Sequence, residues 1–301
     1  GARITSNGGA VRVEGTGGGA GTSAFNYGVC VEFDSEIAST GTGPGATVTV
    51  EGTRGNTMGS SNYGVYVNGS NTQITSNGGA VLVEGTGGGD DASTNNHGVY
   101  VTSGGVITSA GTGSGATVTV KGFGGNTSGT GLANMGVYVV NSDAQITSSG
   151  GAVLVEGTGG GADGITENYG VYVAVGGVIT SAGTGSGATV TVKGFGGNPS
   201  GTAVGNFGVH VVGSNARVTS SGGAVLVEGT GNSNSEALRL QTSGAITSGN
   251  NLNKGAYIQM AVSTTNLQDI VLSLALSASS SGFEIRRVGY FITGDAGDFT
   301  Q

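Results

Sequence analysis

The chain is poor in the residues on which disulfide scaffolds, collagens and membrane anchors depend. Its 301 residues include one cysteine, two prolines and no tryptophan, and only 9% of them are charged. A single cysteine, Cys30, excludes an internal disulfide. Collagen is excluded because proline is so scarce and the glycines follow no three-residue period. No apolar run reaches the roughly 18 to 20 residues of a membrane-spanning helix, so we expect no membrane insertion.

Basic residues are also scarce. Ten Lys and Arg against 18 Asp and Glu give a formal net charge of -8. Because phosphate binding requires clustered cationic side chains, we expect no nucleic-acid partner. Disordered chains combine low hydrophobicity with high charge. Here charge is sparse and Val, Ile and Ala recur at regular places, so the sequence predicts a folded protein.

What the sequence has in abundance is glycine, 66 residues, together with an internal repeat. The motif Gly-Gly-Ala-Val-x-Val-Glu-Gly-Thr-Gly recurs at intervals of 70 to 72 residues, starting at Gly8, Gly78, Gly150 and Gly222. A related Ala-Thr-Val-Thr-Val segment recurs near the middle of the intervals, at 46–50, 116–120 and 188–192. The working unit is therefore about 36 residues, a length typical of solenoid repeats.

Each unit contains three short β-branched segments bounded by Gly, Ser, Asn or Thr, as strands bounded by turns are. In one unit they lie at 80–84, 98–101 and 106–109. Alternate strand residues face opposite sides, so Val-x-Val puts both valines on one face. Strands this short bury that face only by stacking on like strands of neighbouring units. We predict an all-β parallel β-helix, or β-solenoid, with three strands per coil and about seven coils.

The repeat ends before the chain does. We predict a solenoid domain at 1–249 and, at 250–301, a C-terminal β region that caps the solenoid or begins a further β domain. A cap would cover strand edges that otherwise pair with other chains. Gly1 opens in the middle of a repeat, without a basic and apolar leader, so we expect a processed form or a fragment of a longer protein.

The motifs Gly-Ala-Val-Leu-Val-Glu-Gly, Gly-Val-Tyr-Val and Ile-Thr-Ser resemble the Gly- and Thr-rich β-strand repeats of large bacterial surface proteins. These are the filamentous haemagglutinin-like adhesins and the autotransporter passenger domains. The resemblance covers the repeat region and implies a right-handed coil. It also implies export to an extracellular or cell-surface location and a structural or adhesive role.

The best candidate for a binding or assembly site is the middle residue of the second strand. This position forms a column of Cys30, Tyr66, Tyr100, Tyr138, Tyr172 and His210. If the flanking valines point inward, the column points outward as an exposed aromatic ladder. Stacked aromatics stabilise a sheet face, but contiguous exposed aromatic surface also marks contact with sugar rings or another protein. A second column lies two residues before the first inward valine of this strand, so by strand alternation it also points inward. It is expected to close one corner of the core, and its members are Tyr27, Tyr63, His97, Met135, Tyr169 and Phe207.

Three functions remain open on this evidence. The first is an adhesive or structural rod that binds a surface glycan or protein through the ladder or a loop-rich ridge. A self-assembling subunit of an extracellular filament or sheath is the second, and its partner is another copy, side by side or end to end. A polysaccharide-active enzyme is the distant third, since such chemistry requires convergent carboxylates. We expect no enzymatic activity and no cofactor.

Acidic residues give no strong site. One glutamate column recurs every second coil and interleaves with Glu51, Lys121 and Lys193, which predicts cross-rung charge pairing on a solvated face; its members are Glu14, Glu84, Glu156 and Glu228. Weak calcium candidates are Asp90, Asp91 and Asp163, read as solvated loop acids. His97 and His210 lack metal-ligand spacing and are expected to replace aromatic members of their columns. We predict no metal site.

Overall fold

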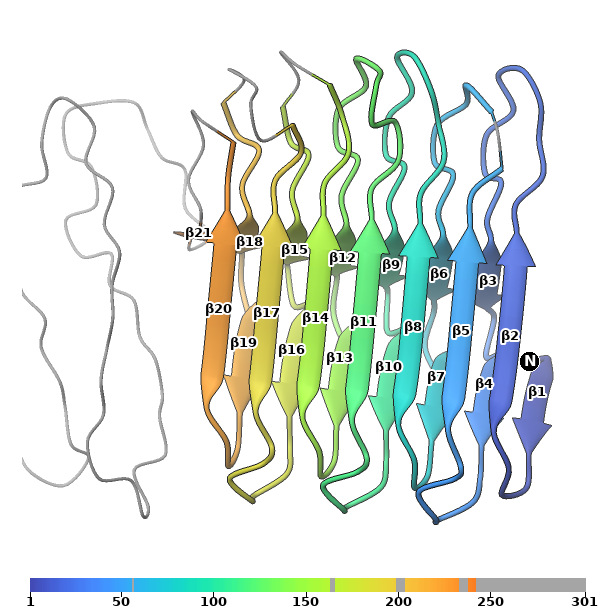
Figure 1. Ribbon diagram of the computed structural model, residues 1–301, viewed down its shortest axis with the longest axis vertical. Helices are drawn as coiled ribbons and strands as arrows, with labels where there is room; N and C mark the ends of the chain where they lie inside the picture. The colour runs from blue at the N-terminus through green and yellow to red at the C-terminus, as the bar shows by residue number, and fades with distance from the viewer. Residues whose placement is uncertain (56, 163–165, 199–203, 233–237, 242–301) are drawn as a thin grey trace, which may run out of the picture. The chain divides into compact units, whose positions relative to one another are not determined.

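The computed structural model describes residues 1–55, 57–162, 166–198, 204–232 and 238–241, and every regular element within them is a β-strand. The strands form three parallel sheets of seven (Figure 1). Sheet A contains β1 (Arg3–Ser6), β4 (Glu36–Ser39), β7 (Gln73–Ser76), β10 (Val106–Ser109), β13 (Gln145–Ser148), β16 (Val178–Ser181) and β19 (Arg217–Ser220). Sheet B contains β2 (Val11–Thr16), β5 (Val48–Thr53), β8 (Val81–Thr86), β11 (Val118–Phe123), β14 (Val153–Thr158), β17 (Val190–Phe195) and β20 (Val225–Thr230). Sheet C contains β3 (Val29–Glu32), β6 (Val65–Asn68), β9 (Val99–Thr102), β12 (Val137–Val140), β15 (Val171–Ala174), β18 (Val209–Val212) and β21 (Leu238–Gln241).

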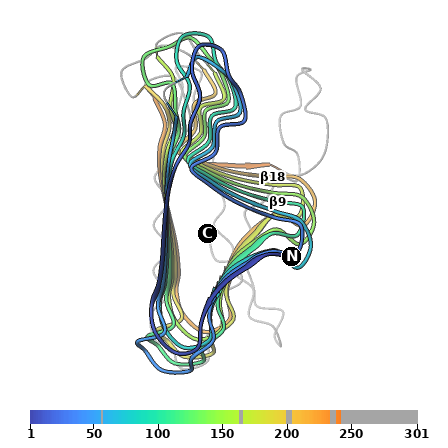
Figure 2. The same ribbon diagram turned by 90° about the vertical axis from the view of Figure 1, so that its right-hand side faces the viewer.

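Neighbouring strands in every sheet are three apart in chain order, so each turn of the chain adds one strand to each sheet. The pairing is in register: Val118 lies beside Val81 on one side and Val153 on the other. In Figure 1 the chain runs up sheet B in front and returns behind it while advancing, and Figure 2 views the same coils end on. The predicted right-handed, three-stranded β-solenoid is confirmed.

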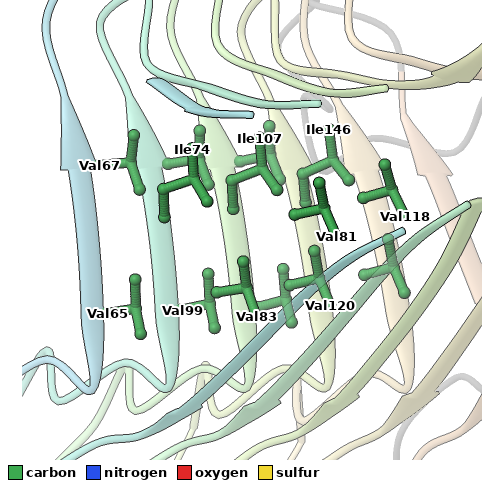
Figure 3. Close-up of a cluster of buried hydrophobic side chains, with 14 of the residues drawn as sticks. Val65, Val67, Ile74, Val81, Val83, Val99, Ile107, Val118, Val120 and Ile146 are labelled. Atoms are coloured by element: carbon green, nitrogen blue, oxygen red, sulfur yellow. The ribbon is translucent and has the colours of Figure 1, made fainter. Parts of the chain in front are cut away.

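The core is a stack of aliphatic side chains between the three sheets (Figure 3). Strands of sheets B and C other than β21 contribute two inward valines each, such as Val118 and Val120, and strands of sheet A other than β19 contribute one isoleucine, such as Ile107; all three are fully buried. Burying a valine or isoleucine contributes about 1.5–3 kcal/mol, whereas ordering one residue costs about 1.5 kcal/mol. A single coil therefore does not hold together alone, and the stacking of coils stabilises the fold.

One corner of the solenoid is closed by backbone rather than by side chains. A Cβ on Gly85 of β8 would lie 2.1 Å from the carbonyl oxygen of Gly98, which precedes β9. Only glycine permits two backbone segments to approach this closely. Sheets B and C consequently meet at a narrow waist, beyond which the longer loops form a separate lobe (Figure 2).

The predicted boundary between 249 and 250, and the C-terminal region at 250–301, lie outside the described residues. In the part of the chain that the structure describes, no helix has the length and hydropathy needed to cross a membrane.

Candidate functional site

The predicted ladder, defined as Tyr66, Tyr100, Tyr138, Tyr172 and His210, lies on the outer face of sheet C. The strand pattern places it there: Val137 and Val139 of β12 are fully buried, and Tyr138 between them points outward. The four tyrosines are only half-buried, whereas His210 is 6% exposed. Cys30, at the equivalent position of β3, is exposed. The direction of the column is thus as predicted, but its surface is only partly accessible.

The rings of the ladder stack face to face along the solenoid. Successive centroids lie 5.3 Å (Tyr66 to Tyr100), 4.9 Å (Tyr100 to Tyr138), 5.0 Å (Tyr138 to Tyr172) and 5.1 Å (Tyr172 to His210) apart. The planes of each pair are within 25° of parallel. This spacing follows from the parallel register, which sets equivalent residues on neighbouring strands about 4.8 Å apart.

The second column lies outside the valine core, contrary to its predicted place at an inner corner. Its parity relative to Val65 would point Tyr63 inward if the strand continued regularly, but β6 begins at Val65, after the Gly64 waist. Glycine backbone of sheet B occupies the inside of that corner, so no ring fits there. The column therefore joins the ladder instead, and its described members are Tyr27, Tyr63, His97, Met135, Tyr169 and Phe207.

The two columns interlock as one aromatic cluster. Tyr63 stacks on Tyr27 and His97 within its own column, at 5.1 and 5.2 Å. Across the columns the rings meet edge to face: Tyr63 with Tyr100 at 78°, and Phe207 with His210 at 83°. Offset-stacked and edge-to-face pairs are the favoured aromatic arrangements, each contributing about 0.5–1.5 kcal/mol beyond area burial. Both histidines replace aromatic members of their columns, as predicted.

An asparagine ladder that was not predicted from the sequence supports the cluster from inside the loop lobe. The residue directly before the second column is asparagine in six coils: Asn26, Asn62, Asn96, Asn134, Asn168 and Asn206. The N–H of each donates to the side-chain Oδ1 of the next, as from Asn96 to Asn134 at 3.0 Å. Asn62 through Asn206 are buried. Its sequence signal is the asparagine that recurs directly before the second-column residue and Gly-Val; only the second-column residue of this pair was given a predicted role.

Burial keeps the tyrosines and His97 of the cluster neutral. Desolvation raises the pKa of Tyr27 to about 12 and raises the pKa of Tyr138 well above 10. Desolvation and the neighbouring Glu32 raise the pKa of the Cys30 thiol to about 12, so this exposed cysteine is a poor nucleophile. Desolvation lowers the pKa of His97 to about 3, and its neutral Nδ1 accepts a hydrogen bond from the Met135 N–H at 3.3 Å.

The stacking limits what the ladder can bind. Tyr100, Tyr138 and Tyr172 each have a ring on both faces, so these faces are not available to a sugar ring. The tyrosines are half-buried, and because their faces are stacked, the parts that remain for contact are ring edges and phenol groups, which recur once per coil. The surface therefore offers a row of hydrogen-bonding groups flanked by apolar edges.

The charged residues form ion pairs rather than a convergent site. Lys121 lies 3.4 Å from Glu84, Lys193 lies 3.2 Å from Glu228, and Arg12 lies 3.1 Å from Glu51. Cross-rung pairing is thus confirmed at these positions. Asp90 and Asp91 are exposed loop residues, and Asp163 lies outside the described part of the chain. Within the described ranges, no group of three or more His, Cys, Asp or Glu residues could hold a metal ion.

Comparisons with known proteins add no relative. No protein-family model matches the chain, and searches of curated proteins and of solved structures gave no match either. The fold supports the β-helix part of the sequence resemblance, and the adhesin part rests on the motifs alone.

Proposed function

We propose that the chain is a structural and adhesive rod of an exported bacterial surface or fibre protein, acting outside the cell or at its surface. The observation that supports this best is the repetition itself. Three in-register sheets, an aromatic cluster and an asparagine ladder each continue from coil to coil. Such an array extends a chain and presents the same groups at regular intervals. Under this proposal the chain catalyses no reaction and needs no cofactor.

The contact surface in this proposal is the ladder. Because both ring faces of Tyr100, Tyr138 and Tyr172 are covered, binding uses the phenol hydroxyls and ring edges of Tyr66, Tyr100, Tyr138 and Tyr172. The partner is a surface glycan or protein with repeated hydrogen-bonding groups, and it lies along the solenoid axis.

The test removes the hydroxyls and keeps the stacks. The quadruple Tyr→Phe variant at the four ladder tyrosines is compared with the natural chain for binding to immobilised extended polysaccharides and to a bacterial or host cell surface. We expect binding by the natural chain, at least a tenfold loss in the variant, and unchanged circular dichroism. Undiminished binding by the variant would remove the ladder as the contact, and no binding by the natural chain would remove the adhesive role.

The second candidate is a subunit of an extracellular filament or sheath, in which the partner is another copy. It is favoured by large apolar side chains exposed on sheet B, among them Phe123 and Phe195. Negative-stain electron microscopy across a concentration series separates the two: ordered filaments support the second candidate, and isolated short particles support the first. Release of reducing ends from polysaccharide would contradict both and favour an enzyme.

A further inference from the structure

The outer face of sheet B is flat and carries three columns of side chains. Seen end on in Figure 2, its strands overlie one another, whereas those of sheet C fan out. The first column is Arg12, Thr49, Leu82, Thr119, Leu154, Thr191 and Leu226. The second is Glu14, Glu51, Glu84, Lys121, Glu156, Lys193 and Glu228. The third is Thr16, Thr53, Thr86, Phe123, Thr158, Phe195 and Thr230.

From β8 onward two kinds of strand alternate on this face. β8, β14 and β20 present Leu, Glu and Thr, whereas β11 and β17 present Thr, Lys and Phe. The large apolar side chains consequently zigzag across the face. Phe123, Phe195 and Leu226 are 49%, 48% and 47% exposed.

The central column leaves one carboxylate without an ion pair. Glu156 lies in register between Lys121 and Lys193. Each lysine instead pairs with the glutamate on its other side, Glu84 or Glu228. Glu156 makes no ion pair within the described part of its own chain. A cation from outside the chain would complete the alternation.

We propose that this face is a homodimer interface, on which a second copy of the chain packs face to face with its coils stacked in the opposite direction. The two-fold axis runs along the strands, between β11 and β14. Each of the four central strands then faces a strand of the other kind: β11 faces β14 of the second copy, and β8 faces its β17.

This arrangement matches charge to opposite charge. Lys121 faces Glu156 of the second copy, which gives that carboxylate its partner, and Glu84 faces Lys193. By symmetry each pair occurs twice. Glu51 comes to face Glu228, but Arg12 and Lys193 already neutralise these two within each chain. Complementary charge across an interface fixes its register.

The same arrangement also matches large side chains to small ones. Phe123 faces Thr158 of the second copy, and Phe195 faces Thr86. In the first column, Leu154 faces Thr119 and Leu82 faces Thr191. Each listed leucine and phenylalanine therefore fills the space over a threonine, which is how two flat sheets interdigitate.

Two other two-fold arrangements fail on charge. An axis along the stacking direction that passes through the charge column sets each strand against its own equivalent, so Glu84 would face Glu84 and Lys121 would face Lys121. An axis through β14 would set Glu156 against itself. Like charges juxtaposed across an interface suppress association. Opposed coils with the axis between β11 and β14 avoid both of these contacts and set six of the seven strands of sheet B against the second copy.

The area suits a weak, reversible dimer. Neighbouring strands lie about 4.8 Å apart, and each strand residue extends about 3.3 Å. The face of seven six-residue strands therefore measures roughly 29 by 20 Å, or about 600 Å². Two copies then bury somewhat over 1,000 Å² in total, near the lower end for specific interfaces. Sheet B and the ladder on sheet C are separate faces, so dimerisation and ladder binding succeed or fail independently.

The first test is sedimentation velocity of the full chain over a concentration series. We expect a monomer–dimer equilibrium that weakens with salt. Glu156→Lys and Lys121→Glu should each raise the dimer dissociation constant by about tenfold or more, and the double variant should return it to within about threefold of the natural value. Asp90→Lys, an equal charge change on an exposed loop, should have no effect. Thermal unfolding confirms that each variant folds.

The second test fixes the orientation. In a Cys30→Ser background, a short bis-maleimide should join two chains that carry both Glu84→Cys and Lys193→Cys, which lie three strands apart within one chain. Chains with Glu84→Cys alone should stay unlinked, because the proposed axis sets position 84 against position 193 of the second copy and not against itself. A monomer at all concentrations, a dimer insensitive to Glu156→Lys, or linking through position 84 alone would overturn the proposal.

Discussion

The phenol ring of Tyr100 lies parallel to that of Tyr138, with the ring planes 7° apart and the centroids 4.9 Å apart. In-register pairing of β9 and β12 enforces this geometry. The same two rings meet His97 of the second column edge to face, at 70° and 74°. The ladder therefore stabilises the packing of the second column on sheet C, in addition to being a candidate contact surface.

The ring and the hydroxyl of Tyr138 should make separable contributions to stability. Tyr138→Phe keeps every ring contact and should change the free energy of unfolding by no more than about 0.5 kcal/mol. Tyr138→Ser removes the stacks on Tyr100 and Tyr172 and should cost about 2 kcal/mol or more. Urea denaturation followed by circular dichroism measures both. Equal stability of the two variants would mean that the stack contributes nothing.

Acid should destabilise the protein through His97. Its pKa is about 3 in the folded chain and 6.5 in the unfolded one, so between these values the unfolded chain binds more protons. Stability then falls as the pH decreases from 6.5 towards 3, by as much as roughly 4 kcal/mol at about 1.4 kcal/mol per pH unit. His97→Phe removes the titrating group and keeps a stackable ring. Denaturation series at several pH values should show a shallower slope for this variant; identical slopes would rule out His97 as the cause.

The asparagine ladder should be costly to interrupt. Asn134→Ala removes the Oδ1 that accepts from the buried N–H of Asn96 at 3.0 Å. Leaving a buried donor unsatisfied costs about 1–3 kcal/mol. Asn77→Ala, at an exposed position, is the matched control and should stay within about 0.5 kcal/mol. The comparison uses the midpoint of urea unfolding, and a small effect at Asn134 equal to that at Asn77 would contradict the ladder's role.

The glycine waist should tolerate no side chain. A Cβ on Gly122 would lie 2.0 Å from the carbonyl oxygen of Gly136, which is a backbone atom. Overpacking costs typically about 1–3 kcal/mol, and here nothing flexible can move aside, so Gly122→Ala should lose at least about 3 kcal/mol. Gly113→Ala meets no atom within 4 Å and serves as the control. Thermal unfolding and limited proteolysis of the two variants give the comparison.

Much of the fold was readable because its signal is local and repeated. Val-x-Val in successive coils predicts inward pairs, and Val118 and Val120 are indeed fully buried. Glu84 and Lys121, at equivalent positions of neighbouring coils, predict the ion pair that the structure contains. The repeat length, the inward or outward direction of each strand residue and the pairing of equivalent residues can be inferred from the sequence, because strand geometry fixes where each residue points.

The site was readable only in part, because parity holds only while a strand continues. Tyr63 shares the parity of Val65, yet it lies against Tyr66 and not in the core. The sequence by itself determined the coil, its three sheets and the outward direction of Tyr138. Tertiary structure decided where the strand stops, since the backbone contact of Gly85 with Gly98 fills the inner corner and leaves the second aromatic column to pack on the ladder.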